Sequence, residues 1–150
     1  MTDMQDFFTN DLLIHANQNA VMAILANPRK LIEWDPEIQS ISEDKHGHRF
    51  IILRTNSALN PREQMTISVK KNTVIYHSTG GRVAYDVIFS LITEENGTAV
   101  TEQVLLDSAS VKGLPVKLLA PIAKHAFMIN LTNLATFVER WALMEDGEAK

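Results

Sequence analysis

Five polar side chains lie in the apolar, alternating middle of the chain, where their chemistry stands out. They are Arg54, Glu63, Tyr76, Tyr85 and Glu102. Glu102 stands between Val100 and Val104, and burial of such a carboxyl raises its pKa, which suits a general acid or a ligand anchor. An arginine on the same sheet face could hold a ligand carboxylate with two parallel hydrogen bonds.

A structural role competes with the chemical role at each position. Glu102 either pairs with Arg54 or lies at a strand end that is open to solvent, while Arg54 either holds a ligand or pairs with Glu63 or Glu102. Tyr76 and Tyr85 either contact a ligand or simply pack in the core. We expect Arg54 and Glu102 to point inward and to interact directly or through one water, because an unpaired buried charge is costly.

Three residues outside this stretch are also candidates for contact with a ligand. Asn130 and Asn133 lie on the apolar side of a predicted terminal helix, where they bond a polar ligand atom, each other or a loop. Trp34, at the end of a short predicted helix, either packs in the core or gates a cavity.

Metal and cofactor chemistry find no support in the sequence. The histidines lie on different predicted elements and form no credible set of metal ligands; they are His15, His46, His48, His77 and His125. The chain has no cysteine, which excludes a thiolate nucleophile, a disulfide and a cysteine-ligated metal. Nucleotide-binding and serine-hydrolase motifs are also absent, so we predict neither a metal nor a cofactor.

Composition indicates a single globular domain over residues 1–150, with 45% apolar and 21% charged residues. The net charge of −4 argues against binding of nucleic acid, which needs a basic surface. No apolar run approaches the roughly 20 residues of a membrane span, and the acidic start of the chain lacks the basic residues of a signal peptide. We therefore expect a cytoplasmic protein without stable membrane insertion, either a monomer or a homodimer.

The first elements can be placed from capping and proline signals. Residues 8–16 alternate as a strand, and Asn17 can cap a helix that follows. Pro28 suits the first turn of a second helix, and Pro36 should end it, because the residue before a proline avoids the helical conformation.

The rest of the chain is predicted to be strands followed by one long helix. Turn signals divide runs rich in Ile, Val, Thr, Tyr and Phe, which favours an antiparallel meander; they lie at 46–47, 58–61, 71–72, 80–81 and 96–97. From Pro115 to about Glu145 the apolar period becomes helical. Pro121 should kink or restart this helix. The predicted apolar face consists of Leu119, Ile122, Ala123, Ala126, Ile129, Leu134, Phe137 and Trp141.

Residues 14–36 read IHANQNAVMAILANPRKLIEWDP, which resembles the opening of the START/polyketide cyclase-like (SRPBCC, helix-grip) superfamily. The order of predicted elements extends the resemblance over nearly the whole chain. It implies an α+β fold with about seven strands in a curved antiparallel sheet around the C-terminal helix, and two short helices after the first strand. Such an architecture usually encloses a ligand cavity.

Hairpin parity predicts which side chains share the covered face. Short turns place Leu91 opposite Glu102, Tyr76 opposite Tyr85 and Ile67 opposite Tyr76. A four-residue loop at 58–61 places Arg54 opposite Met65, and Asn56 opposite Glu63. The resulting ligand-contact set is Trp34, Phe50, Ile52, Arg54, Met65, Tyr76, Tyr85, Val87, Phe89, Glu102, Val104, Ile122, Ala126, Ile129, Asn130 and Asn133.

Three functions fit these expectations. The first is binding or transport of a small hydrophobic or amphipathic molecule in an internal cavity, with Arg54, Glu102 or an asparagine fixing its orientation. The second is an enzyme similar to the cyclase/aromatase or dehydratase members of the superfamily, with Glu102, Arg54 and Tyr76 as acid/base and orienting groups. The third is an interaction module that keeps the fold and fills the cavity.

Overall fold

A computed structural model describes residues 3–45, 49–55 and 59–148, and these form one sheet and a long helix packed against it. The strands are β1 (Met4–Ile14), β2 (Ile38–Glu43), β3 (Phe50–Arg54), β4 (Arg62–Lys70), β5 (Thr73–Thr79), β6 (Tyr85–Glu94) and β7 (Gly97–Asp107). The helices are α1 (Gln18–Leu25), α2 (Leu31–Trp34) and α3 (Val116–Glu148), with 3₁₀ turns at Pro28–Lys30 and Ser108–Val111.

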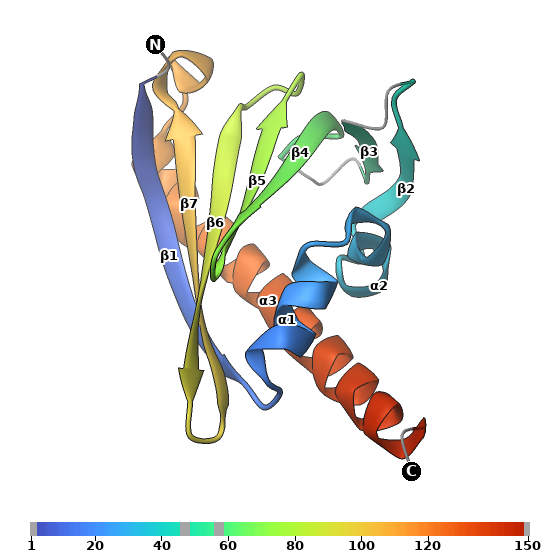
Figure 1. The fold of residues 1–150 in the computed structure, drawn as a ribbon. Coiled ribbons are helices and arrows are strands. Elements are labelled where there is room, and N and C mark those ends of the chain that lie inside the picture. The colour runs from blue at the N-terminus through green and yellow to red at the C-terminus, as the bar shows by residue number, and fades with distance from the viewer. Residues whose placement is uncertain (1–2, 46–48, 56–58, 149–150) are drawn as a thin grey trace.

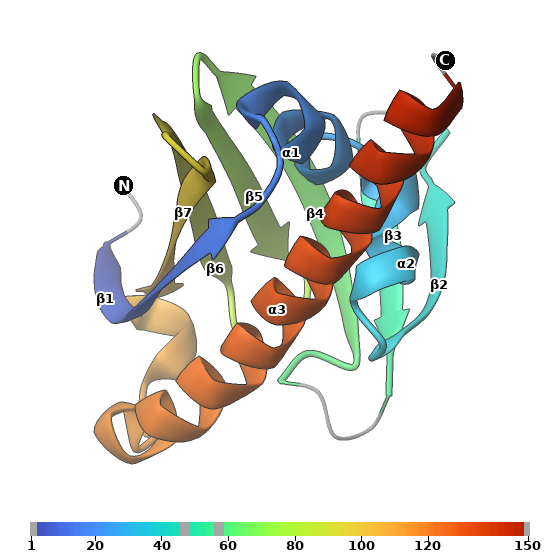
Figure 2. The ribbon, with the colours of Figure 1, turned by 90° about the horizontal axis from the view of Figure 1, so that it is seen from below.

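The sheet has the strand order β1-β7-β6-β5-β4-β3-β2, and every neighbouring pair is antiparallel. Strands β2 to β7 form a meander. The first strand, β1, lies at the edge opposite β2 and pairs with β7 (Figure 1). Helix α3 runs across one face of the curved sheet, with α1 and α2 beside it (Figure 2). The predicted helix-grip architecture, with two short helices between the first and second strands, is therefore confirmed.

The local signals that begin and end the short helices act as predicted. The side-chain oxygen of Asn17 accepts a hydrogen bond from the amide of Ala20 at 2.8 Å, which satisfies an otherwise unpaired donor of α1. Pro28 begins the 3₁₀ turn that leads into α2, and α2 ends at Trp34, two residues before Pro36. This corner of the chain also contains Asp35, which forms an ion pair with Arg54.

The hairpins keep the predicted parity, although several partners differ. Tyr76 lies opposite Ile67, as predicted, but on its other side it faces Val87 rather than Tyr85. Glu102 lies opposite Phe89 rather than Leu91, because the β6–β7 turn is formed one residue earlier than expected. Each shift moves the partner by two residues, so the same side chains still face the helix.

The β3–β4 connection departs most from the prediction. Met65 lies opposite Phe50 rather than Arg54, because the connection is longer than the four residues assumed. Arg54 is the last residue of β3, and its amide donates to the carbonyl of Pro61 at 2.7 Å. Ile52 takes the place opposite Glu63, and the predicted partner Asn56 lies outside the described residues.

Helix α3 closes the core with its C-terminal half. Leu131, Leu134 and Val138 are completely buried, whereas Ile129 is 48% exposed, so its assignment to the inward face was wrong. The helix is continuous through Pro121 and does not restart there. Within the part of the chain that the structure describes, no helix combines the length and apolarity that crossing a bilayer requires.

Position 97, at the start of β7, requires glycine because the backbone of Ile14 lies too close for a side chain. A Cβ at this position would lie 2.1 Å from the carbonyl oxygen of Ile14, and the residue has a φ of +150°. We expect Gly97→Ala to lower the free energy of unfolding by more than about 2 kcal/mol, measured by urea denaturation. Gly113→Ala is the matched control, because that glycine has a φ of +83° but open space around it. Equal losses in the two variants would contradict the role of the Ile14 contact.

Candidate functional site

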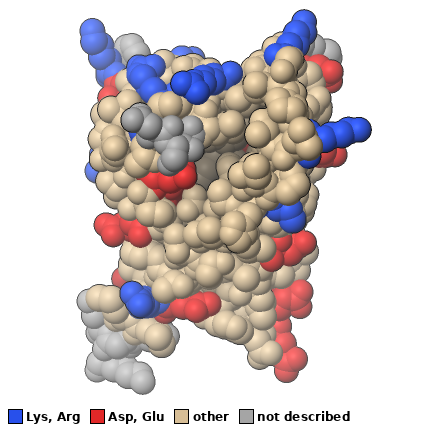
Figure 3. Space-filling view, turned by 180° about the vertical axis from the view of Figure 1, so that it is seen from behind, with Lys and Arg blue, Asp and Glu red and all other residues tan. Residues whose placement is uncertain are grey.

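A cavity of about 290 Å³ lies between the concave face of the sheet and the N-terminal half of α3. Figure 3 views the molecule from the side of α3, where the surface is hollowed and the rim of the hollow is mostly uncharged. The predicted residues that line this cavity are Trp34, Arg54, Met65, Tyr76, Tyr85, Val87, Phe89, Glu102, Ile122, Ala126 and Asn130. An apolar wall with a few polar groups is the usual composition of a small-molecule site.

Five predicted residues do not line the cavity, and the structure corrects their placement. They are Phe50, Ile52, Val104, Ile129 and Asn133. Val104 is covered, because Phe8 lies opposite it on β1 and the Phe8 ring meets Phe127 of α3 at 5.0 Å.

The other four residues that were wrongly predicted to line the cavity lie outside its wall. Phe50 faces a separate hollow at the β2–β3 edge, and Ile52 is completely buried beside Glu63. On α3, Ile129 is 48% exposed and Asn133 is half-buried, and the cavity wall on this helix extends only from Leu119 to Asn130 without Ile129.

Nine residues of the wall were not in the predicted ligand-contact set, although Leu119 and Ala123 had been placed on the apolar face of the terminal helix. They are Phe7, Leu31, Asp35, Glu37, Leu59, Asn60, Leu119, Ala123 and Phe127. Phe7 reaches the cavity because of a register irregularity between Asp6 and Phe8 in β1, which inverts the local alternation and has no sequence signal. Asp35 directly precedes the proline that was read only as a helix stop.

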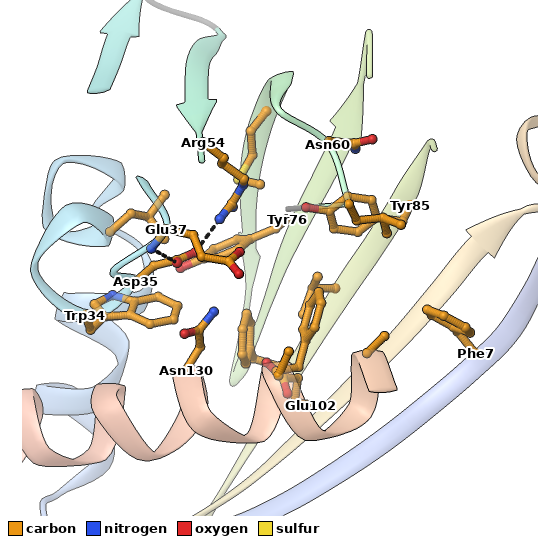
Figure 4. A pocket seen from close by; sticks show the side chains of 18 of the residues that line it. Phe7, Trp34, Asp35, Glu37, Arg54, Asn60, Tyr76, Tyr85, Glu102 and Asn130 are labelled. Atoms are coloured by element: carbon orange, nitrogen blue, oxygen red, sulfur yellow. Dashed lines mark hydrogen bonds and ion pairs between the residues drawn. The ribbon is translucent and has the colours of Figure 1, made fainter. Parts of the chain in front are cut away.

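Arg54 is the centre of a buried ion-pair cluster. Its Nε donates to Glu63 Oε1 at 2.9 Å, and its Nη1 donates to Asp35 Oδ2 at 2.6 Å. The arginine side chain is 11% exposed, while that of Glu63 is 0% exposed. The structure thus selects the Arg54–Glu63 pair. It adds Asp35, the residue that follows α2, as a second partner (Figure 4).

Glu63 is held by donors from several strands and loops. Besides Arg54, it accepts from Ser78 Oγ at 2.7 Å, Tyr85 OH at 2.8 Å and Asn60 Nδ2 at 3.1 Å. Burial raises the pKa of Tyr85 well above its ordinary value, so its phenol stays a neutral donor. With its hydrogen-bonding capacity used within the protein, Glu63 serves to fix Arg54.

The position of Asn60, which donates to Glu63, depends on close packing against a glycine. Its amide also bonds the backbone of Val83, accepting at 2.9 Å and donating at 2.7 Å. A Cβ on Gly81 would lie 2.5 Å from Asn60 Cγ. The Gly80-Gly81 turn signal therefore reflects close packing against the ion-pair cluster as well as a change of chain direction.

Glu102 lies apart from that cluster, which contradicts the predicted Arg54–Glu102 contact. Both residues line the cavity, but the partner of Glu102 is Asn10, whose Nδ2 donates to Oε1 at 3.2 Å. Strands β6, β5 and β4 separate β7 from β3. Four strand spacings amount to roughly 19 Å along a flat sheet, so a shared face did not imply a shared contact.

The Glu102 carboxyl is titratable near neutral pH. It is 2% exposed, and this burial raises its pKa to about 7, while the Asn10 hydrogen bond and the Lys124 charge oppose the rise. Asn10 is itself oriented by Lys124, which donates from Nζ to Asn10 Oδ1 at 3.0 Å. Among the described residues, Glu102 Oε2 has no hydrogen-bond partner.

The hydroxyl of Tyr76, the third catalytic candidate, is hydrogen-bonded to the protein backbone. Its hydroxyl donates to the carbonyl of Leu25 in α1 at 2.6 Å, and burial raises its pKa well above the ordinary value. Trp34 is 6% exposed, and its Nε1 has no hydrogen-bond partner among the described residues. Within those same residues, no three histidine, aspartate or glutamate side chains gather closely enough to hold a metal ion.

Solved structures share this fold at low sequence identity. The di-domain ARO/CYC protein StfQ of the steffimycin biosynthetic pathway matches 93% of this chain with a TM-score of 0.71 and 13% identity, and the match spans 52% of that protein. A START superfamily protein from Mycobacterium smegmatis matches 91% of this chain and 99% of its own, with a TM-score of 0.74 and 13% identity. A conserved protein from Geobacillus kaustophilus has a TM-score of 0.68 at 12% identity, covering 88% of this chain and 94% of its own.

The fold is therefore START/polyketide cyclase-like, as the resemblance implied. No protein-family model and no curated protein matches the sequence. At these identities the structural likeness establishes the architecture alone, so function must be argued from the cavity.

The buried cluster predicts a large stability loss on removal of its cation. Arg54→Met would leave Glu63 and Asp35 buried without their partner, so we expect a loss of about 3–5 kcal/mol in urea denaturation. Arg29→Met is the control: its salt bridge to Glu43 joins side chains that are 78% and 39% exposed, and its loss should cost less than about 1 kcal/mol. Losses of similar size would show that the Arg54 cluster is not stabilising.

We predict that the contribution of Glu102 to stability falls as the pH rises, whereas that of a carboxylate in a salt bridge increases with pH. Because its folded pKa of about 7 exceeds the unfolded value, its contribution is fully present at low pH and is lost as pH rises through about 7. Glu102→Gln should match the wild type near pH 5 and exceed it near pH 8, by up to about 3 kcal/mol. Thermal and urea unfolding at both values, with exposed Glu94→Gln as control, would measure this. A less stable Glu102→Gln at the higher pH would contradict it.

Proposed function

We propose that this protein binds a small, largely apolar molecule in the cavity between the sheet and α3. The observation that carries the proposal is a cavity of about 290 Å³ lined by Phe89, Val87, Met65 and other apolar side chains. Burial of the ligand's apolar surface would supply the affinity, and the few polar groups of the wall would fix its orientation.

Two features of the wall support binding rather than a filled interior. Leu134 and Val138 of the C-terminal half of α3 are completely buried, but the N-terminal half leaves Ile122 70% exposed at the cavity. Natural proteins seldom keep a space of this size without an occupant, because unfilled volume in a core is destabilising.

Catalysis of a cyclase-like reaction is a second candidate, favoured by one observation. Glu102 combines a pKa of about 7 with an oxygen that lacks a partner in the described structure, which suits a general base or acid at neutral pH. The engagement of Arg54 and Tyr76 in protein contacts leaves Glu102 to act without them. If the protein is an enzyme, Glu102→Gln should abolish turnover and retain ligand binding.

Ala123→Phe tests the binding proposal by filling the cavity. Ala123 lies on α3 and on the cavity wall, so a phenyl ring there would occupy the ligand's space. We expect the affinity for N-phenylnaphthylamine, a neutral fluorescent probe, to fall about tenfold or more, with the fold retained. His125→Phe places the same ring on an exposed position of α3 that is not on the wall, and it should bind like the wild type.

Native mass spectrometry of the purified protein provides an independent test. Small molecules that co-purify with the wild type should be depleted in Ala123→Phe and retained in His125→Phe. A wild-type protein that neither carries a small molecule nor binds the probe would overturn the proposed function.

A further inference from the structure

The charges on the cavity wall are unbalanced, because the one cation is already neutralised. Among the described residues that line the cavity, Arg54 is the sole basic side chain. Its Nε and Nη1 are bonded to Glu63 and Asp35, so it cannot present a free two-pronged edge to a carboxylate. An acidic ligand group at Arg54 would therefore meet a guanidinium whose charge is already paired with two carboxylates.

Acceptors, by contrast, remain available in the cavity. Glu102 is 2% exposed and its Oε2 has no hydrogen-bond partner among the described residues, and the side chains of Glu37 and Asn130 make no hydrogen bond with other described residues. Figure 4 shows Glu37 and Asn130 directed into the cavity from opposite sides, and Glu102 beside α3. The nearby ammonium of Lys124 is engaged by Thr9 and Asn10 and is not on the wall.

Most of the remaining polar groups of the wall are occupied by the protein itself; the exception is Trp34 Nε1, a neutral donor without a partner among the described residues. The hydroxyls of Tyr76 and Tyr85 donate to Leu25 and Glu63, and both ends of the Asn60 amide bond neighbouring groups. A ligand therefore meets the Glu37 and Glu102 carboxylates and two neutral polar groups, the Trp34 N–H and the Asn130 amide, on an apolar wall. The uncompensated charge comes from the carboxylates alone, which attract a positive charge and repel an anion.

We infer that the cavity selects an apolar molecule that carries a cationic nitrogen, with Glu102 as its acceptor, and that it disfavours fatty acids and other carboxylate-headed amphiphiles. This inference rests on the proposed function and names the ligand class of that same cavity. A protonated amine at Glu102 satisfies the unpaired oxygen and neutralises a buried charge, whereas a carboxylate there adds a second buried charge of the same sign.

The test is a matched series on one ring system: naphthylmethylamine, naphthylmethanol, methylnaphthalene and naphthoate. Displacement of N-phenylnaphthylamine would give each affinity at about pH 8, above the Glu102 pKa of about 7. We expect the amine to bind at least about tenfold tighter than naphthoate, with the uncharged compounds between them.

Variants identify the acceptor. Glu102→Gln removes the charge with little change of shape, and should reduce the amine-to-naphthoate ratio about fivefold or more. Glu37→Gln, at a half-buried position, is a second variant with a smaller expected reduction, and exposed Glu94→Gln should leave the ratio unchanged.

The outcomes separate this inference from the proposed function. Equal binding of all four compounds, a preference for naphthoate, or a ratio that neither Glu102→Gln nor Glu37→Gln alters would overturn the ligand class and leave cavity binding intact. Binding of none of the four would overturn cavity binding, and the ligand class with it.

Discussion

The buried pairing of Arg54 with Glu63 is the constraint on which the rest of the site depends. A carboxylate that is completely excluded from solvent is tolerated only when its charge is neutralised and its oxygens are bonded. Ser78, Tyr85 and Asn60 supply the remaining donors. This cluster joins β3, β4, β5 and β6, so the short strand β3 is held to the sheet by more than its few backbone hydrogen bonds.

The same cluster positions the corner after α2. Asp35 accepts from Arg54 Nη1 and from the amide of Glu37, which fixes the direction in which the chain enters β2. That direction turns the Trp34 ring and the Glu37 carboxylate to the cavity wall. Because Arg54 Nε and Nη1 serve this architecture, the charge of the residue that looked most suited to bind an anion is already paired within the protein.

Helix α3 divides the interior into a packed part and an open part. Leu131, Leu134 and Val138 fill the space over one end of the sheet, and smaller residues such as Ala123 leave the space over the other end unfilled. Glu102 lies in the open part, where it keeps a carboxyl that titrates near pH 7 and destabilises the fold when it ionises. Such a residue is more readily explained by a ligand than by the stability of the domain.

The sequence by itself determined the order of the elements, the caps of the short helices, and the face of the sheet on which most inward side chains lie. These are local properties: Asn17 caps α1 within its own turn, and the two-residue period of a strand survives even when a hairpin shifts, as it did for Glu102. Only the tertiary structure decided which inward residues meet. Asp35 joins Arg54 from a separate corner of the chain, Phe7 turns inward at an irregularity in β1, and three intervening strands keep Glu102 from Arg54, because distances across a sheet depend on strand order and loop length rather than on alternation.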